Sequence, residues 1–171
     1  MDKISLEEFR RRIKAQNVSD RLHAAFKCPM CKTVQSLKSF ISVGEHPEQA
    51  EKLIGFSCVG RVTKADPPRK VPDGLPCNWS LGGLFKLHEL EVIDEEGSAH
   101  PYFEVATAEE AQALEAAIVM AEAHQCPFKI FTSIGNFEEK AESPKEATAM
   151  VIKANPGILI KKIKRVKEFG K

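Results

Sequence analysis

The chain has 171 residues, of which 43% are hydrophobic and 29% are charged. That length fits one ordinary domain or two small ones, and the hydrophobic share is enough to bury a core and excludes a disordered tail. The formal net charge is only +1, which gives no overall attraction to nucleic acid or to an anionic membrane. The charge is uneven, because residues 94–122 hold eight acidic and no basic side chains, whereas residues 153–171 hold seven basic side chains and one glutamate.

No segment of the sequence is typical of a membrane anchor or an export signal. The first residues, MDKISLEEFRRRIK, place charges where a signal peptide needs an apolar stretch, and the longest wholly apolar run, residues 116–121, is far too short to span a bilayer. We therefore expect a cytoplasmic protein with no membrane partner. Disulfides are uncommon in that reducing compartment, so the five cysteines indicate metal ligands or redox thiols.

Short helices dominate the first predicted elements. A serine and a glutamate at capping-box spacing, followed by apolar residues at helical spacing, predict an amphipathic helix over residues 6–16. After the cysteine-containing sequence FKCPMCKTVQS, a short helix is expected over residues 37–43. A further helix begins at Pro47 and is closed by Gly55.

A strand, a loop and a hairpin are expected next. Residues 56–62 have the composition of a strand, whereas residues 64–77 hold four of the ten prolines and predict an ordered but irregular loop. The apolar residues over 84–93 predict a second strand. The turn sequence EEGSA joins that strand to PYFEV as a hairpin.

The C-terminal part alternates between helices and strands. Thr107 and Glu110 form a second capping box, which predicts a long alanine-rich helix. The segment KIFTSIGNFEEKAE then indicates one long or bent strand. A helix starting near Ser143 ends in a turn at residues 155–157, and residues 158–166 predict a basic strand.

These elements indicate an α+β protein with two parts. We expect a zinc-stapled, loop-rich N-terminal module over residues 1–105. A small α/β domain, consisting of a helix and a strand-helix-strand unit, is expected over residues 106–171.

Four of the five cysteines suggest one metal site. Cys28 and Cys31 in CPMC can approach an ion from a single tight turn, and Cys58 and Cys77 supply two more thiolates. The proline-rich loop can return Cys77 to the predicted strand that carries Cys58. Because that loop has little apolar content, we expect a structural zinc ion to hold it, a contribution of roughly 10 to 16 kcal/mol in small domains.

Other interpretations of the cysteines remain open. An iron-sulfur cluster uses the same ligands, a redox CxxC pair leaves Cys58 and Cys77 unexplained, and buried cysteines can act as small apolar side chains. If one cysteine is not a ligand, His46 or His88 is the expected substitute.

Three sequence blocks carry a family resemblance. CPMCKTVQS, GFSCVGR and GLPCNWSLGGLFKLHELEV resemble a family of small, functionally uncharacterised proteins encoded by tailed phages and prophages, over about residues 22–105. The resemblance implies a phage or prophage origin, hence the cytoplasm of a host bacterial cell, and a cysteine site at Cys28, Cys31, Cys58 and Cys77. It implies no activity. Lys32 stands where the familiar knuckle often has glycine.

Basic side chains near the cysteines form a candidate binding surface, which we call the loop surface. With an exposed aromatic ring beside them, either Trp79 or Phe85, they can grip a nucleic-acid backbone and stack a base. A solvated loop beside a core tryptophan is the alternative. The loop surface consists of Arg61, Lys64, Arg69, Lys70 and Trp79.

No catalytic residues are predicted, because no nucleotide-binding glycine motif and no carboxylate-histidine pair at a supporting spacing is present. We expect a non-enzymatic interaction protein that modulates a host or phage macromolecule, one form being an inhibitor of a host defence system. A zinc-containing nucleic-acid-binding accessory protein is the alternative, and a zinc-dependent or thiol enzyme is the third candidate.

Overall fold

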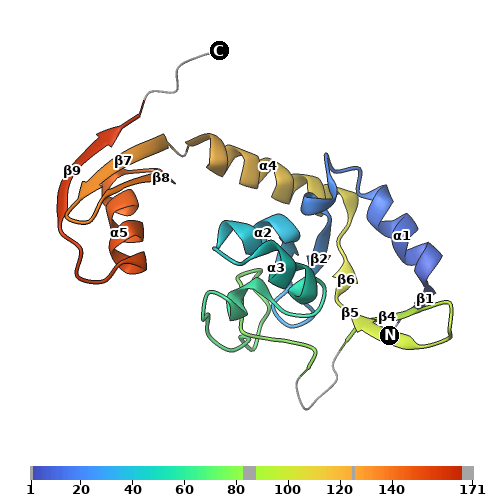
Figure 1. The fold of residues 1–171 in the computed structure, drawn as a ribbon. Coiled ribbons are helices and arrows are strands. Elements are labelled where there is room, and N and C mark those ends of the chain that lie inside the picture. The colour runs from blue at the N-terminus through green and yellow to red at the C-terminus, as the bar shows by residue number, and fades with distance from the viewer. Residues whose placement is uncertain (1, 83–87, 125, 167–171) are drawn as a thin grey trace. The chain divides into compact units, whose positions relative to one another are not determined.

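The structure is a computed structural model that describes residues 2–82, 88–124 and 126–166. Helices and strands are mixed, which confirms the predicted α+β class. The chain forms two compact units, unit 1 (Met1–Ile118) and unit 2 (Val119–Lys171) (Figure 1). None of the helices in the described part of the chain is long and apolar enough to cross a membrane.

Unit 1 contains two small sheets and several short helices. Its elements are β1 (Asp2–Ser5), α1 (Leu6–Ala15), η1 (Arg21–His23), β2 (Ala25–Lys27), β3 (Val34–Ser36), α2 (Leu37–Ser42), α3 (Pro47–Leu53), η2 (Val59–Arg61), β4 (Leu90–Ile93), β5 (Ala99–Tyr102), β6 (Glu104–Val105) and α4 (Ala108–His124), which runs past the division between the units. In one sheet β1 pairs in parallel with β4, which pairs antiparallel with β5. In the other sheet β2 lies between β3 and β6 and is antiparallel to both.

The predicted first helix is α1, which begins where Ser5 accepts a hydrogen bond from the Glu8 N–H at 3.2 Å. Its apolar stripe buries Phe9, whose ring centroid lies 4.9 Å from that of Tyr102. The buried amide of Gln16, just after α1, donates to the carbonyl oxygens of Ala25 and Ala106. This amide therefore ties the end of α1 to the second sheet.

Helix α4 begins at the predicted capping box, where Thr107 and Glu110 exchange hydrogen bonds of 3.0 and 3.3 Å. Ala111 is buried against unit 1, and Glu115 accepts from the Ser19 N–H at 3.1 Å. Because these first turns of α4 pack on unit 1, the compact units divide within the helix, whereas the sequence suggested a boundary after residue 105.

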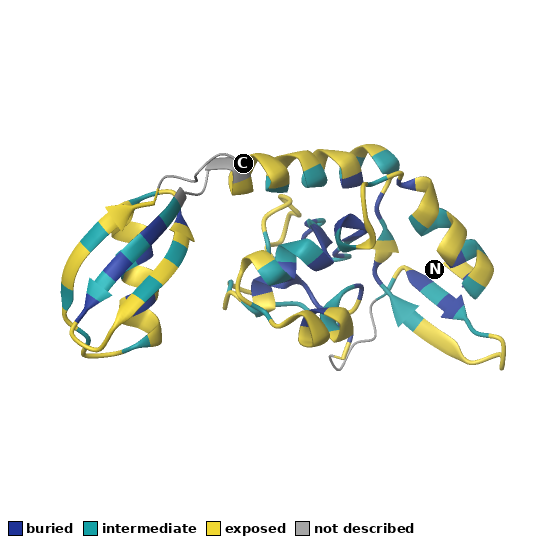
Figure 2. Ribbon diagram, turned by 45° about the horizontal axis from the view of Figure 1, so that its top comes forward, coloured by how far each residue is buried: buried dark blue, intermediate teal, exposed yellow. Residues whose placement is uncertain are grey.

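Unit 2 is a three-stranded antiparallel sheet with one helix on one face (Figure 1). Its elements are β7 (Cys126–Thr132), β8 (Asn136–Ala141), α5 (Pro144–Ala154) and β9 (Ile160–Arg165), in the sheet order β8-β7-β9. The core of the unit lies between the sheet and α5, and its buried members are Phe128, Ile130, Ala141, Ala147 and Val151 (Figure 2).

Two predicted strands are wrong. Residues 56–62 contribute only an isolated bridge between Ser57 and Ser80, followed by the 3-10 turn η2. The segment predicted as one long strand is the β7–β8 hairpin, because the Thr132 hydroxyl accepts the Ile134 and Gly135 N–H groups and closes a turn. A run of residues that favour strands does not reveal where a side-chain hydrogen bond closes a turn between two strands.

The predicted β4–β5 hairpin is present, with register Leu90 to Tyr102, but its extension differs from the prediction. Glu104 and Val105 leave the hairpin and pair with β2 instead. Residues 84–87, the start of the strand predicted over residues 84–93, lie outside the described residues, and so does Phe85, the alternative ring of the loop surface. Strand β1 was not predicted from the sequence, and its parallel partner β4 lies far away in the chain.

Candidate metal centre

The turn between β2 and β3 carries the first two cysteines. Cys28 and Thr33 close it with a backbone hydrogen bond of 2.9 Å, and the Lys32 N–H donates to the Cys28 carbonyl oxygen at 2.9 Å. Lys32 has a φ of 60°, a left-handed conformation that glycine adopts at lower cost. That conformation explains why glycine is common after the second cysteine of such knuckles.

Cys58 is placed by a buried amide on the neighbouring strand. Gln35 in β3 is 0% exposed, and its side chain donates to the Ser57 carbonyl oxygen and accepts from the Val59 N–H, both at 2.7 Å. The Cys58 N–H in turn donates to the Trp79 carbonyl oxygen at 2.9 Å. Cys58 is thus held on both sides by hydrogen bonds rather than by a regular strand.

Cys77 approaches the site over a glycine. A Cβ atom at Gly60 would lie 2.5 to 2.9 Å from the carbonyl oxygen, nitrogen and carbonyl carbon of Cys77, closer than such atoms can pack. The Cys77 N–H points at the Cys58 sulfur at 3.5 Å. Sequence reasoning missed Gly60 and Gln35; the GFSCVGR block contains the glycine two residues after Cys58, which is the available signal.

The four cysteines meet at one point in the core of unit 1. All four sulfur atoms lie within 4.8 Å of one another, and the residues are 0 to 1% exposed. The Cys28 and Cys77 sulfurs are 3.9 Å apart, and those of Cys31 and Cys58 are 3.8 Å apart. A tetrahedral ion with metal-sulfur bonds of about 2.3 Å places its sulfurs about 3.8 Å apart. The four cysteines can therefore hold a metal ion.

Packed this closely, the thiols perturb one another. The Cys28 thiol donates a hydrogen bond that lowers the pKa of Cys58 and raises that of Cys28. Burial raises the pKa of Cys77 to about 12. Four buried thiolates repel one another unless a cation is present, and a divalent ion supplies the positive charge that favours their ionised form. A metal ion bound at this cluster would therefore displace the protons of these thiols.

The proline-rich loop is attached to this cluster and to little else. No residue from 61 to 76 is buried, and Val71 is 76% exposed. Its fixed points are Gly74, which donates to the Cys31 carbonyl oxygen and accepts from the Thr33 hydroxyl, both at 2.9 Å, and Asn78, which donates to Asp66. These contacts agree with the expectation that core burial does not hold the loop.

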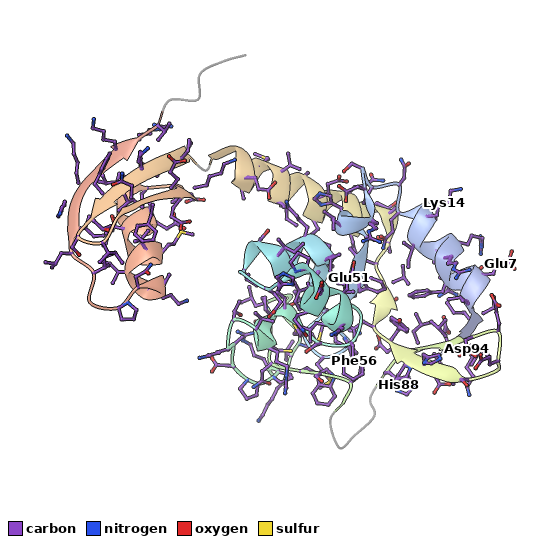
Figure 3. All side chains as sticks on the ribbon, viewed as in Figure 1. Glu7, Lys14, Glu51, Phe56, His88 and Asp94 are labelled. Atoms are coloured by element: carbon purple, nitrogen blue, oxygen red, sulfur yellow. The ribbon has the colours of Figure 1, made fainter. Side chains whose placement is uncertain are left out.

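Neither of the two alternative histidine ligands belongs to the described cysteine cluster. His46 is exposed at the start of α3. His88, beside β4 (Figure 3), lies 2.9 Å from the Glu91 carboxylate through its Nε2 atom. Among the described residues, the cluster that can hold an ion consists of cysteines alone.

Only two of the five loop-surface residues line a common hollow. Arg61 and Trp79 line a common hollow of about 300 Å³ with Asn78, Ser80 and Gly82. Lys64, Arg69 and Lys70 are exposed but do not line that hollow, and Arg69 pairs with Asp73 at 3.1 Å. The structure therefore brings together the arginine and the ring, and leaves the other three basic side chains elsewhere on the loop.

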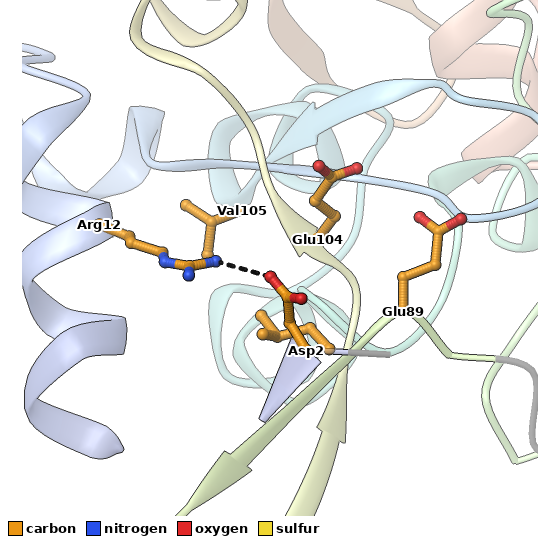
Figure 4. A pocket seen from close by; sticks show the side chains of 6 residues that line it. Asp2, Arg12, Glu89, Glu104 and Val105 are labelled. Atoms are coloured by element: carbon orange, nitrogen blue, oxygen red, sulfur yellow. Dashed lines mark ion pairs between the residues drawn. The ribbon is translucent and has the colours of Figure 1, made fainter. Parts of the chain in front are cut away.

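A second hollow in unit 1, of about 290 Å³, gathers carboxylates (Figure 4). Asp2 pairs with Arg12 at 3.5 Å, and Glu89 pairs with Lys32 at 2.9 Å, while Glu104 also lines the wall. These carboxylates are not among the described groups that can hold a metal ion, and neither a histidine nor a cysteine lines this hollow. Asp2 and Glu89 are thus members of surface ion pairs.

A comparison with protein families gave one match. The family model described as VVA0879-like matches residues 5–106, which include all four clustered cysteines and most of unit 1. Neither a curated protein nor a solved structure matches the chain. Since the matched segment covers more than half of the sequence, the chain belongs to the VVA0879-like family.

Proposed function

We propose that the four cysteines hold one structural zinc ion. The observation that supports this is the closed, all-sulfur donor set, buried at 0 to 1% exposure with sulfur spacings near those of a tetrahedral site. Structural zinc sites are four-coordinate and closed, whereas catalytic ones keep a position open for water or substrate. Metal analysis of the purified protein is expected to give about one zinc per chain, and iron in its place would refute the assignment.

Under this proposal the protein is not an enzyme but a binding protein, and the zinc holds the loop surface in a fixed conformation. None of residues 61–76 is buried; the segment carries Arg61, Lys64, Arg69 and Lys70, and it is anchored at the cysteine cluster through Gly74 and Cys77. A fixed loop costs less conformational entropy on binding than a flexible one. The proposed partner is a macromolecule with an acidic surface.

The resemblance of the three sequence blocks to phage and prophage proteins extends the proposal to the origin of the chain and to its binding partner. A phage-encoded protein of this kind would act in the host cytoplasm on a host or phage protein, one form of such action being inhibition of a host defence system. The test is a tagged pull-down of the full chain from host cells. We expect a stoichiometric partner with the wild type and with the control pair Arg10→Glu and Lys14→Glu, which lie exposed on α1.

The matching loop variant carries Lys64→Glu and Lys70→Glu, two exposed positions outside the metal cluster. It is expected to keep its zinc and to lose the partner. Equal capture by the loop variant and the control would refute the loop surface as the binding site, as would an empty pull-down with the wild type.

Nucleic acid is the alternative partner of the loop surface, and the hollow that Arg61 shares with Trp79 favours it. The buried indole Nε1 atom of Trp79 has no hydrogen-bond acceptor among the described residues. An arginine beside an aromatic ring can combine phosphate contact with base stacking. Binding of labelled DNA or RNA that weakens with salt and is lost in the Lys64→Glu, Lys70→Glu variant would support this alternative.

A further inference from the structure

In unit 2, helix α5 covers one face of the sheet, and no other described element of the unit covers the opposite face, which we call the open face (Figure 1). Ile130 and Ile163 point toward the core beneath α5, so alternation along each strand directs their neighbours to the open face. The side chains directed there include Lys129 and Phe131 of β7, Glu138 and Lys140 of β8, and Lys162 and Lys164 of β9.

The register places one aromatic ring among these lysines. Phe131 on the central strand lies directly opposite Lys162, and Lys129 lies directly opposite Lys164. Phe131 is half-buried and is not a member of the core beneath α5. A ring on the middle strand of an open sheet face, with cationic side chains around it, has the arrangement that proteins use to stack bases.

The charges on this face favour an anionic occupant. Like charges directly opposite each other destabilise a strand pair, as at Lys129 and Lys164. Glu138 offsets part of this repulsion through an ion pair of 3.3 Å with Lys129, which leaves an excess of positive charge. Unit 2 as a whole holds ten Lys or Arg and six Asp or Glu residues.

Protection of a sheet edge does not account for the whole pattern. Lysines on the edge strand β9 can prevent pairing with another chain. Lys129 and Phe131, however, lie on the central strand, where both neighbours are already paired. A ring and a lysine in this position add nothing to edge protection, so a ligand explains them better.

The geometry points to the open face of unit 2 as a binding surface for single-stranded nucleic acid, with Phe131 stacking on a base and Lys129, Lys162 and Lys164 contacting phosphates. Each nucleotide combines a planar base with a negative charge, which matches the ring and the lysines together. An acidic protein surface would match the lysines but leave Phe131 without a role. This surface is separate from the cysteine cluster and goes beyond the function proposed above.

The test is fluorescence anisotropy of the full chain with labelled oligo-dT and oligo-rU of about 20 nucleotides, compared with a duplex of the same length, at about 50 and 200 mM salt. We expect salt-dependent binding that is tighter for the single strands than for the duplex. The DNA and RNA arms show which strand is preferred. Absence of binding at the lower salt, or tighter binding to the duplex, would overturn the proposal.

Matched variants locate the site. Lys162→Glu with Lys164→Glu should weaken binding at least tenfold and reduce the slope of log affinity against log salt by about 1.4, from two lost phosphate contacts. Lys145→Glu with Lys153→Glu, exposed on α5, makes the same charge change away from the open face and should keep most of the binding. Equal losses in the two pairs, or loss only in the Lys64→Glu, Lys70→Glu variant, would overturn the proposal.

The aromatic ring is tested separately with Phe131→Leu, which keeps an apolar side chain. We expect about a tenfold loss of affinity with an unchanged salt slope, because stacking is lost while the phosphate contacts remain. Thermal unfolding and the zinc content of each variant show whether it is folded. A folded Phe131→Leu variant with wild-type affinity would refute the stacking role.

Discussion

The cores of the two units of this chain are built from different side chains. The core of unit 1 contains four cysteines that lie between aromatic and aliphatic side chains, and its loop from residue 61 to 76 has no buried residue. Unit 2 has an ordinary apolar core between a sheet and α5, with Ile130 at 0% exposure. If the proposed zinc is bound, it takes the place of apolar burial where the chain must keep an exposed loop in position.

The largest effect is expected for Cys58→Ser, since this change removes one ligand of the proposed ion. Because structural zinc contributes roughly 10 kcal/mol or more in small domains, we expect unit 1 to unfold at room temperature while unit 2 stays folded. Metal analysis should show loss of zinc, and amide hydrogen exchange should show loss of protection in β2 and β3 but not in β7. Unchanged metal content and melting would show that Cys58 is not a ligand.

The reciprocal change is Ile130→Ala in the core of unit 2. Removing a fully buried isoleucine side chain costs about 2 to 5 kcal/mol, so unit 2 should lose protection while unit 1 keeps its zinc. The same two measurements check this outcome. Loss of zinc together with loss of protection in unit 2 would mean that the two units do not unfold separately.

Gly60→Ala tests how closely Cys77 must approach without removing a ligand. Its Cβ would lie 2.5 Å from the Cys77 carbonyl oxygen, so the loop must shift, at an expected cost of about 3 kcal/mol in unit 1. A competition assay with a chromophoric chelator should show weaker metal binding. Gly82→Ala is the matched control, because its nearest contact is Phe56 at 3.4 Å; equal effects of the two changes would argue against a role of close packing.

The smallest expected effect concerns the ion pair between β2 and α4. Lys27 and Glu110 are 2.6 Å apart. Burial opposes ionisation of Glu110, but hydrogen bonds from Lys27 and Thr107 lower its pKa below 4.5. A carboxyl group with a lowered pKa stabilises the folded state above its unfolded pKa, and this stability is lost as the pH falls through the folded pKa.

Glu110→Gln should therefore reduce the free energy of unfolding of unit 1 by about 1 kcal/mol at pH 7 and by less below about pH 4. Chemical denaturation at several pH values measures this difference. The control is Lys3→Gln, which removes the ion pair between the exposed Lys3 and Glu91. For this variant we expect a smaller change in the free energy of unfolding at pH 7. A pH-independent effect of Glu110→Gln would contradict a contribution from the ionised carboxylate of Glu110.

The sequence alone identified the α+β class, the first helix and its Ser5 cap, the capping box at Thr107, and the four cysteines that the structure brings together. The helix starts depend on short-range chemistry because a cap lies within one helical turn, and cysteines that cluster in the sequence indicate shared metal ligands. The CPMC pair carried most of that signal because both of its ligands come from one turn.

Only the tertiary structure decided how Cys58 and Cys77 reach the site. The predicted strand at residues 56–62 is instead a turn, held by the Gln35 amide from another strand and packed over Gly60. The pairing of β1 with β4 and the open face of unit 2 likewise depend on which strands become neighbours. Such contacts join residues that are distant in the chain, and the local pattern of a sequence does not reveal which strand pairs with which.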